Sequence, residues 1–227
     1  MIFQKQLDRL ESEVFFSRPQ RRQAFLMTDS KGRYLEAQVH RGEAIVDIVW
    51  KSGARVDNKE LLSIISDKIM NLDRPVVLVW LGTCEFTEKR GRNIYLREQN
   101  SVADVLARLQ ALKANIIKQN SSTEVIFLKC PIYSIVHENG SDSFSSEDEQ
   151  LHEQLEILNQ DISHLNATTV PNLSMDLLKN TKRKQGRRSN YIYKFQDIYK
   201  DGVHPIDILA ELWLRKIQKI VIARNDR

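Results

Sequence analysis

The apolar run at residues 75–81, with the sequence PVVLVWL, constrains the fold of this chain more than any other segment. A run this short and this rich in β-branched residues is typical of a central parallel strand that is covered on both faces. Shorter apolar runs predict further strands at residues 24–28, 44–50 and 124–128. A short fifth strand is expected at residues 167–170.

Between these runs lie segments in which apolar residues recur at three- and four-residue spacing, the period of an amphipathic helix. They cover residues 3–15, 31–40, 58–71, 101–118, 147–165 and 206–222. Asn58 stands where it can cap the third of these helices. Strands that alternate with helices predict a three-layer α/β/α sandwich around a central parallel sheet of about five strands.

Length and composition fit one compact domain. The chain has 227 residues, of which 41% are hydrophobic and 28% are charged, and no Pro/Gly/Ser-rich linker divides it. We therefore expect a single domain over residues 1–227, with an N-terminal helix at 3–15 and the core at 24–222. A net charge of +4 is too small to mark a dedicated nucleic-acid binder.

The two cysteines, Cys84 and Cys130, are far apart, and no CxxC or Cys/His cluster predicts a metal site. The first residues are charged and lack the apolar core of a signal peptide. No run approaches the roughly 18–20 apolar residues that a membrane span needs. We expect an intracellular protein, cytoplasmic or nuclear, that does not associate with a membrane.

Three polar side chains are placed where they could form a nucleophile, a base and an orienting carboxylate. Ser30 follows the first predicted strand, and Asp201 and His204 stand three apart in a late loop. Functional groups gather at the carboxyl ends of parallel strands, so Ser30, Gly53 and Cys84 are expected to share one edge of the sheet. Alternatively, Ser30 only caps the following helix, and the late loop is an ordinary turn.

In this order the segments resemble the four sequence blocks of the SGNH (GDSL-like) hydrolase superfamily, which has a flavodoxin-like sandwich fold and hydrolyses esters. The resemblance spans residues 24 to about 222. The matching segments are Thr28-Asp29-Ser30, Gly53, Gly82-Thr83-Cys84-Glu85, and Asp201 with His204.

The resemblance implies a serine esterase that acts on small acyl esters through an acyl-enzyme, without a metal or an organic cofactor. Ser30 would be the nucleophile, His204 the general base and Asp201 its partner. The resemblance also implies an oxyanion hole built from the backbone N–H groups of Ser30 and Gly53 and from a third donor. Cys84 stands where the superfamily has asparagine, and a thiol is a weak donor, so the oxyanion hole is altered. Cys84 could instead be a nucleophile or a small buried hydrophobic residue.

The alternative function is a catalytically reduced SGNH-like domain that binds RNA or serves as an interaction module, a setting that resembles accessory domains encoded by some retroelements. Clustered cations at residues 179–188 could bind phosphates, or they could form a mobile basic loop. The candidate nucleic-acid-binding residues are Lys182, Arg183, Lys184, Arg187 and Arg188.

Two loops complete the predicted rim. Residues 83–97 form a polar loop, in which Arg90, Arg92 and Arg97 either line the cleft and attract an anionic substrate or are solvated. Residues 131–149 form a long loop, either an ordered lid or a disordered excursion, whose acidic and serine-rich second half favours mobility.

Overall fold

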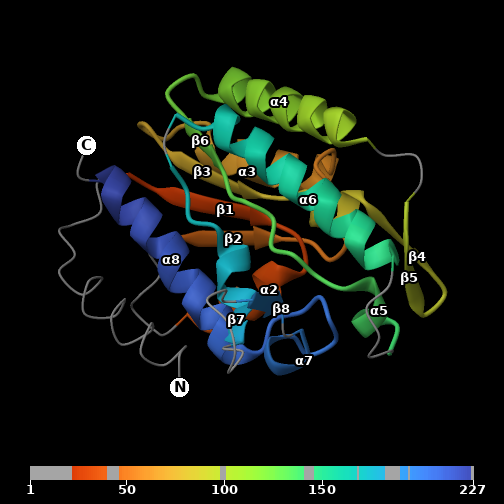
Figure 1. The fold of residues 1–227 in the computed structure, drawn as a ribbon. Coiled ribbons are helices and arrows are strands. Elements are labelled where there is room, and N and C mark those ends of the chain that lie inside the picture. The colour runs from red at the N-terminus through yellow and green to blue at the C-terminus, as the bar shows by residue number, and fades with distance from the viewer. Residues whose placement is uncertain are drawn as a thin grey trace.

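The centre of the molecule is a parallel sheet of four strands in the order β2-β1-β3-β6, shown in Figure 1. The structure is a computed structural model that describes residues 22–39, 46–97, 101–140, 146–167, 169–181, 190–193 and 195–225. The strands are β1 (Ala24–Thr28), β2 (Asp47–Trp50), β3 (Val76–Trp80) and β6 (Glu124–Phe127). The two inner strands, β1 and β3, are buried at every residue, as expected for apolar strands with helices on both faces.

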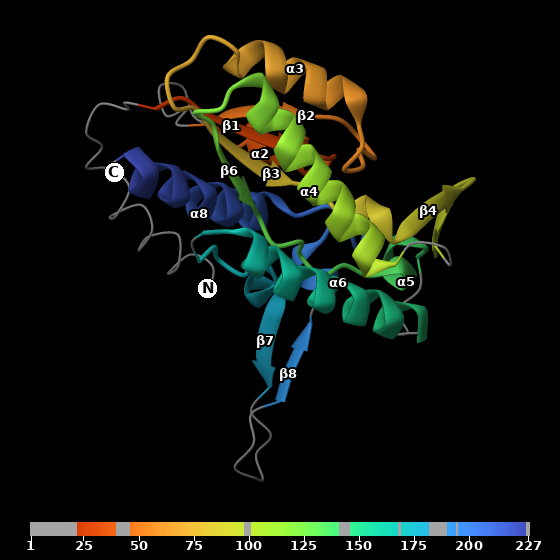
Figure 2. The ribbon, with the colours of Figure 1, turned by 90° about the horizontal axis from the view of Figure 1, so that it is seen from above.

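Helices cover both faces of this sheet, so the predicted three-layer sandwich is confirmed. The long helices are α3 (Lys59–Ile69), α4 (Val102–Gln119), α6 (Ser146–Leu165) and α8 (Asp207–Asn225), and the shorter α2 (Lys31–Glu36) follows β1. Helix α2 packs against α8, and α3 packs against α4. Figure 2 shows α3 and α8 on opposite sides of the sheet. As predicted, Asn58 caps α3, where its side chain accepts a hydrogen bond of 3.0 Å from the backbone N–H of Leu61.

The predicted fifth strand is wrong for the residues described. Residues 167, 169 and 170 lie in bends and irregular chain. The side-chain amide of Asn166 instead forms hydrogen bonds of 2.8 Å with both the N–H and the C=O of Phe127. A side chain therefore provides the hydrogen bonds for the backbone groups of Phe127 on the outer edge of β6, where a fifth strand would begin to pair.

The predicted polar loop at residues 83–97 is also wrong. After a 3-10 turn (Thr83–Glu85), this segment forms an antiparallel hairpin of β4 (Thr87–Arg90) and β5 (Asn93–Leu96). Gly91, with φ of +65°, makes the turn. β4 reads TEKR, which lacks the apolar alternation that would predict a strand. The hairpin extends outward from the end of β3 (Figures 1 and 2).

The first part of the long loop after β6, residues 131–140, contains the one-turn helix α5 (Ile135–Glu138). The buried carboxylate of Asp148, in α6, holds the start of α5 by accepting hydrogen bonds from the Ser134 hydroxyl and the Ile135 N–H at 2.8 and 2.7 Å. Asn139 then forms hydrogen bonds with both the N–H and the C=O of Ile94 in the hairpin. The hairpin and α5 are thus joined at one edge of the sheet. Residues 141–145 lie outside the description.

The remaining elements precede α8. They are a 3-10 helix (Leu173–Leu177), a hairpin of β7 (Leu178–Thr181) and β8 (Asn190–Tyr193), and the short helix α7 (Phe195–Ile198). The basic residues Lys182, Arg183, Lys184, Arg187 and Arg188 fall between β7 and β8, outside the described residues, as does the N-terminal helix predicted at 3–15. Within the described chain, no helix has the length and apolar character to cross a bilayer.

Candidate active site

Ser30 lies at the junction between the end of β1 and the start of α2. Its backbone is at the N-cap position of that helix, with φ of −55° and ψ of −20°, but its side chain makes no capping hydrogen bond. The alternative that Ser30 serves only as a cap is therefore not supported, because the hydroxyl is directed elsewhere.

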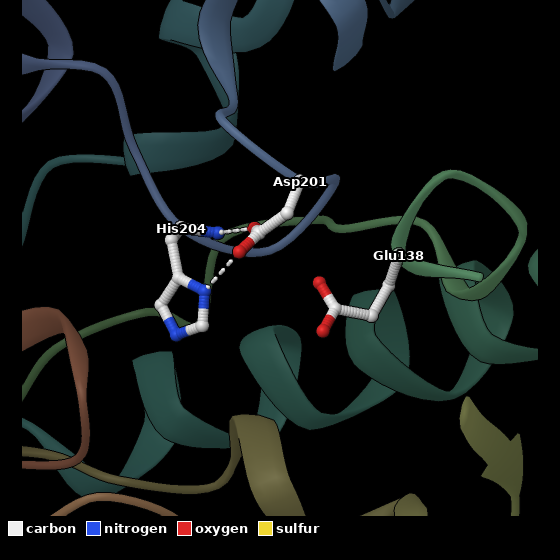
Figure 3. Close-up of side chains that lie close together, drawn as sticks. All are labelled: Glu138, Asp201 and His204. Atoms are coloured by element: carbon white, nitrogen blue, oxygen red, sulfur yellow. Dashed lines mark hydrogen bonds and ion pairs between the residues drawn. The ribbon is translucent and has the colours of Figure 1, made fainter. Parts of the chain in front are cut away.

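The Ser30 hydroxyl faces the imidazole of His204, with 3.1 Å between Oγ and Nε2. On the other side of the ring, Nδ1 lies 2.6 Å from Oδ2 of Asp201 (Figure 3). The second oxygen of Asp201 accepts hydrogen bonds from the backbone N–H groups of Val203 and His204 at 3.1 and 2.7 Å. With Nδ1 protonated toward the carboxylate, Nε2 is left as the acceptor for the serine proton.

The Asp201 carboxyl is held as an anion. Burial alone would raise its pKa, but the hydrogen bonds from the His204 side chain and backbone outweigh burial and lower the pKa to about 2. The structure thus brings together the three residues that the sequence singled out, in the order serine, imidazole and carboxylate. Their catalytic role stays a prediction.

A tight turn at Gly202 presses this loop onto α5. Gly202 has φ of +89°, and a Cβ built there would lie 2.7 Å from both the backbone nitrogen of Glu138 and the Cβ of His137. Its carbonyl accepts a hydrogen bond of 3.1 Å from the N–H of Ser134. Only glycine allows both this backbone conformation and this close approach. The loop that carries Asp201 and His204 is therefore positioned by α5.

A cavity of about 270 Å³ opens beside Ser30 and His204, and Gly53 and Cys84 also line it. Gly53 lies in an exposed turn after β2 with φ of +67°. The half-buried thiol of Cys84 lies 3.8 Å from Oδ2 of Asp29, and burial raises the pKa of Cys84 well above its usual range. A protonated thiol is a poor nucleophile, so the structure does not favour Cys84 as the attacking group.

Solved structures with a similar architecture include proteins described as esterases and lipases. A lipase/acylhydrolase from Enterococcus faecalis has a TM-score of 0.57 and 16% identity, covering 89% of this chain and 96% of that protein. A carbohydrate acetylesterase from Sinorhizobium meliloti has a TM-score of 0.58 and 11% identity, covering 90% and 100%. The chain has an SGNH hydrolase fold. At these identities the likeness establishes the fold alone.

A third structure with this SGNH fold, a carbohydrate esterase family 3 protein from Talaromyces cellulolyticus, has a TM-score of 0.53 and 13% identity, covering 90% of this chain and 98% of that protein. No family model matches the sequence, and no curated protein matches it. The similarity is therefore carried by the arrangement of the elements in space rather than by the sequence.

In this SGNH fold, Glu138 is a site residue that sequence reasoning missed. Its carboxylate faces Asp201 and His204 (Figure 3), and one ligand atom from each of the three residues lies within 4.8 Å of the others. Burial, followed by the negative charge of Asp201, raises the pKa of Glu138 to about 7. No sequence signal marked this residue, because α5 lies inside a segment that was expected to be a loop. Such a cluster does not by itself define a metal site, and the absence of a metal stays a prediction.

The residues on either side of Ser30 in the sequence form a buried ion pair. The side chains of Asp29 and Lys31 are 1% and 2% exposed and form a salt bridge. The Lys31 ammonium also donates to the Thr83 hydroxyl at 3.0 Å and lies 5.1 Å from the centre of the Trp80 ring. The two neighbours of Ser30 in the sequence therefore anchor it from below.

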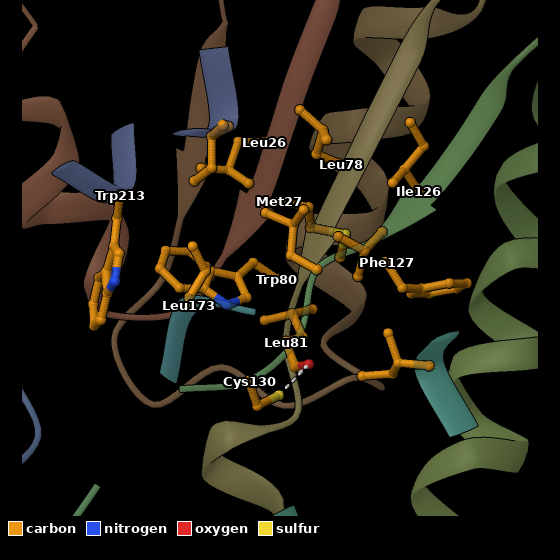
Figure 4. Close-up of a cluster of buried hydrophobic side chains, with 14 of the residues drawn as sticks. Leu26, Met27, Leu78, Trp80, Leu81, Ile126, Phe127, Cys130, Leu173 and Trp213 are labelled. Carbon is orange, nitrogen blue, oxygen red and sulfur yellow. Dashed lines mark hydrogen bonds between the residues drawn. The ribbon is translucent and has the colours of Figure 1, made fainter. Parts of the chain in front are cut away.

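The floor of this region is the apolar cluster shown in Figure 4. Trp80 packs edge-to-face against Trp213, with 5.3 Å between ring centres. Cys130 is fully buried, its sulfur lies 3.4 Å from the carbonyl oxygen of Leu81, and burial raises the pKa of Cys130 to about 12. Cys84 and Cys130 are both free cysteines. Cys130 thus acts as a small core residue.

The three arginines at residues 90, 92 and 97 differ in their position relative to the cavity. Arg97 lines the cavity, whereas Arg90 and Arg92 are exposed and do not. Arg90 pairs with Glu88 and lies 5.5 Å from the centre of the Tyr95 ring. Of the two alternatives given for these arginines, cleft lining holds for Arg97, and solvent exposure holds for Arg90 and Arg92.

Proposed function

We propose that the protein is a serine hydrolase that cleaves small acyl esters through an acyl-enzyme. The observation that supports it most is the hydrogen-bonded series from Ser30 Oγ through the His204 ring to Asp201, at 3.1 and 2.6 Å. This series opens into a cavity of about 270 Å³, which suits a short acyl group. The SGNH fold, found also in esterases and lipases, agrees with the proposal.

In the first half-reaction, Ser30 Oγ attacks the carbonyl carbon of the ester while His204 Nε2 takes the hydroxyl proton. Asp201 stabilises the imidazolium that results. The tetrahedral intermediate collapses as His204 gives its proton to the departing alcohol, which leaves the acyl group on Ser30. In the second half-reaction, His204 takes a proton from water as the water attacks the acyl-enzyme. Collapse releases the carboxylic acid and returns the proton to Ser30.

The weak point of this proposed machinery is the stabilisation of the oxyanion. The candidate donors are the backbone N–H groups of Ser30 and Gly53, and Cys84 occupies the position of the third. Its thiol lies 3.8 Å from Oδ2 of Asp29, a competing acceptor for its one weak donor. Loss of one oxyanion donor costs about 10²–10³ in rate. We therefore expect a slow esterase.

The decisive experiment measures hydrolysis of 4-nitrophenyl acetate by the native protein and by Ser30→Ala. We expect hydrolysis to fall to the background rate in the variant, and a fluorophosphonate probe to label native protein at Ser30 alone. Ser121→Ala, in an exposed turn, is the matched control and should keep full activity. Equal rates for the native protein and Ser30→Ala would refute the proposal.

A further inference from the structure

We propose that the cavity beside Ser30 selects esters that carry a carboxylate, and that Arg55 is the side chain that recognises this second charge. This inference rests on the proposed function, because it names the substrate class of the same site. Two observations support it. Several cations line the cavity, and within the described residues they form few hydrogen bonds or ion pairs with the protein.

Three cations line the cavity from two elements that are far apart in sequence. Arg55 comes from the turn after β2, two residues beyond Gly53, and Lys89 and Arg97 come from the hairpin. Among the residues that the structure describes, no hydrogen bond or ion pair engages the side chain of Arg55, and no carboxylate forms an ion pair with Lys89. Positive charge thus faces the cavity from both sides.

Arg97 is only partly satisfied. Its nearest carboxylate oxygen, on Glu88, is 3.8 Å from its terminal nitrogen. Its Nε is buried and, within the described chain, has no hydrogen-bond partner. Leaving a buried donor without a partner is costly, at about 1–3 kcal/mol.

Two carboxylates also line the cavity, but they offset the charge of the three cations only in part. Glu88 is held by Arg90, which lies outside the cavity and donates from Nε to Glu88 Oε1 at 2.7 Å. The pKa of Glu138 is raised to about 7 by burial and by Asp201, so this carboxyl is only partly ionised at neutral pH. The lining therefore keeps a surplus of positive charge, which attracts a negative group on the substrate.

The chemistry and size of the cavity favour a carboxylate. An unpaired guanidinium offers a planar pair of N–H donors that matches the two oxygens of a carboxylate. At about 270 Å³ the cavity is near the lower end of the roughly 300–1,000 Å³ typical of ligand pockets. A short ester with one compact charged end fits this space, and Ile94 and Val203 supply apolar surface for its carbon chain.

The test compares two matched pairs of esters that place the charge on either side of the scissile bond. In the first pair, mono-4-nitrophenyl glutarate carries a carboxylate on its acyl group, and 4-nitrophenyl valerate is its neutral counterpart. In the second pair, 3-acetoxybenzoate carries a carboxylate on its leaving alcohol, and its methyl ester is the neutral counterpart. We expect kcat/KM to favour the anionic ester at least 10-fold in one pair, and added NaCl to reduce this preference.

Arg55→Gln should lower the anionic-to-neutral ratio of kcat/KM at least 10-fold, and Arg55→Lys, which keeps the charge but loses the paired donors, should lower it less. The matched control is Arg92→Gln, an exposed cation of the hairpin outside the cavity, which should keep the native ratio. Circular dichroism checks that each variant is folded. If Arg55→Gln is not folded, Arg97→Gln replaces it with the same expected loss.

A binding measurement separates failure of this inference from failure of the proposed function. Calorimetry with Ser30→Ala should detect glutarate binding that weakens at least 10-fold when Arg55→Gln is added. Ser30-dependent hydrolysis without any preference for the anionic esters would overturn the inference alone. Absence of Ser30-dependent hydrolysis for all four esters would overturn the proposed function, and absence of glutarate binding as well would overturn both.

Discussion

The hydroxyl oxygen of Ser30 lies 3.1 Å from Nε2 of His204, although the two residues are 174 positions apart in the sequence. Each lies close to the start of a helix: Ser30 directly precedes α2, and His204 lies three residues before Asp207, the first residue of α8. Because α2 and α8 pack against each other, the chain segments that lead into them are held close together. The contact between the Ser30 hydroxyl and the His204 ring thus follows from helix packing.

Replacing Asp201 by asparagine should lower kcat by about 10³–10⁴. The amide would donate to Nδ1 of His204 and so place the ring proton on Nε2, where the serine proton must be accepted. The measurement is kcat for 4-nitrophenyl acetate. Asp207→Asn removes an exposed carboxylate that pairs with Lys200 at 3.0 Å, and it should have native kcat. A loss below 3-fold in Asp201→Asn would contradict the assigned role.

Cys84→Asn should raise kcat about 10- to 100-fold, because an amide N–H is a far better donor to an oxyanion than a thiol directed at Asp29. Cys84→Ala should lack this gain, so comparing the two variants separates a new donor from the loss of the thiol. Thermal unfolding confirms that both are folded. If the asparagine variant is folded and no faster than the alanine variant, the position of residue 84 does not contribute an oxyanion donor.

Gly202→Ala should destabilise the fold by about 2–5 kcal/mol, the sum of a left-handed backbone cost of about 1–2 and an overpacking cost of about 1–3 against α5. Gly91→Ala is the matched control, because Gly91 has φ of +65° but no atom within 4 Å of a built Cβ. It should show only the backbone cost. Urea unfolding measures both free energies, and equal losses would show that the close approach to α5 is unimportant.

Lys31→Met should cost about 3–5 kcal/mol in the free energy of unfolding, because it leaves the buried carboxylate of Asp29 without its cation. The double variant Lys31→Met/Asp29→Asn should recover most of this loss, which a double-mutant cycle in urea measures. Lys68→Met, which breaks an exposed pair with Asp47, should cost at most about 1 kcal/mol. Strictly additive losses in the cycle would argue against the buried pair.

Glu138→Gln should change how stability depends on pH. The pKa of Glu138 is raised from 4.5 to about 7 in the folded protein, by burial first and by Asp201 next, while His204 and Lys89 oppose this rise. The folded state then binds the proton more tightly than the unfolded state, so this carboxyl costs stability as pH rises from about 4.5 to 7. The variant lacks this titration.

The unfolding temperature of Glu138→Gln relative to the native protein should therefore increase between pH 5 and pH 8. Calorimetry at four pH values across this range tests it. Glu149→Gln, on the exposed side of α6, should show no such trend. A difference between Glu138→Gln and native protein that stays constant with pH would mean that Glu138 has an ordinary carboxyl pKa in the folded state.

Much of the architecture could be predicted from local pattern. The apolar run at 75–81 became the buried strand β3, and the helical periodicity at 101–118 became α4. The hairpin β4–β5 could not be predicted in this way, because β4 is polar throughout and shows no apolar alternation. Its β5 strand is attached to α5 through Asn139, whose amide satisfies the backbone of Ile94. A strand that is stabilised by such tertiary contacts does not need alternating apolar and polar residues, so the sequence pattern does not predict it.

The residues of the candidate site also fall into those that could be predicted from the sequence and those that could not. Ser30, Asp201 and His204 could be selected because each lies at a recognisable boundary, a strand end or a turn before a helix. Glu138 and Arg55 could not, since nothing local distinguishes them from surface residues. Glu138 is significant because it is partly buried beside Asp201, and Arg55 because it lines the cavity without a partner among the described residues.

By itself, then, the sequence determined the four strands of the central sheet, the long helices that cover it and the chemical groups available at its carboxyl edge, because apolar periodicity and turn residues act over a few neighbouring positions. Tertiary structure alone decided that Ser30, His204 and Asp201 fall into one hydrogen-bonded series, that the hairpin and α5 border it, and which charges there remain unpaired. Distances, burial and electrostatic fields between remote residues depend on how the helices pack on the sheet, and no local pattern encodes them.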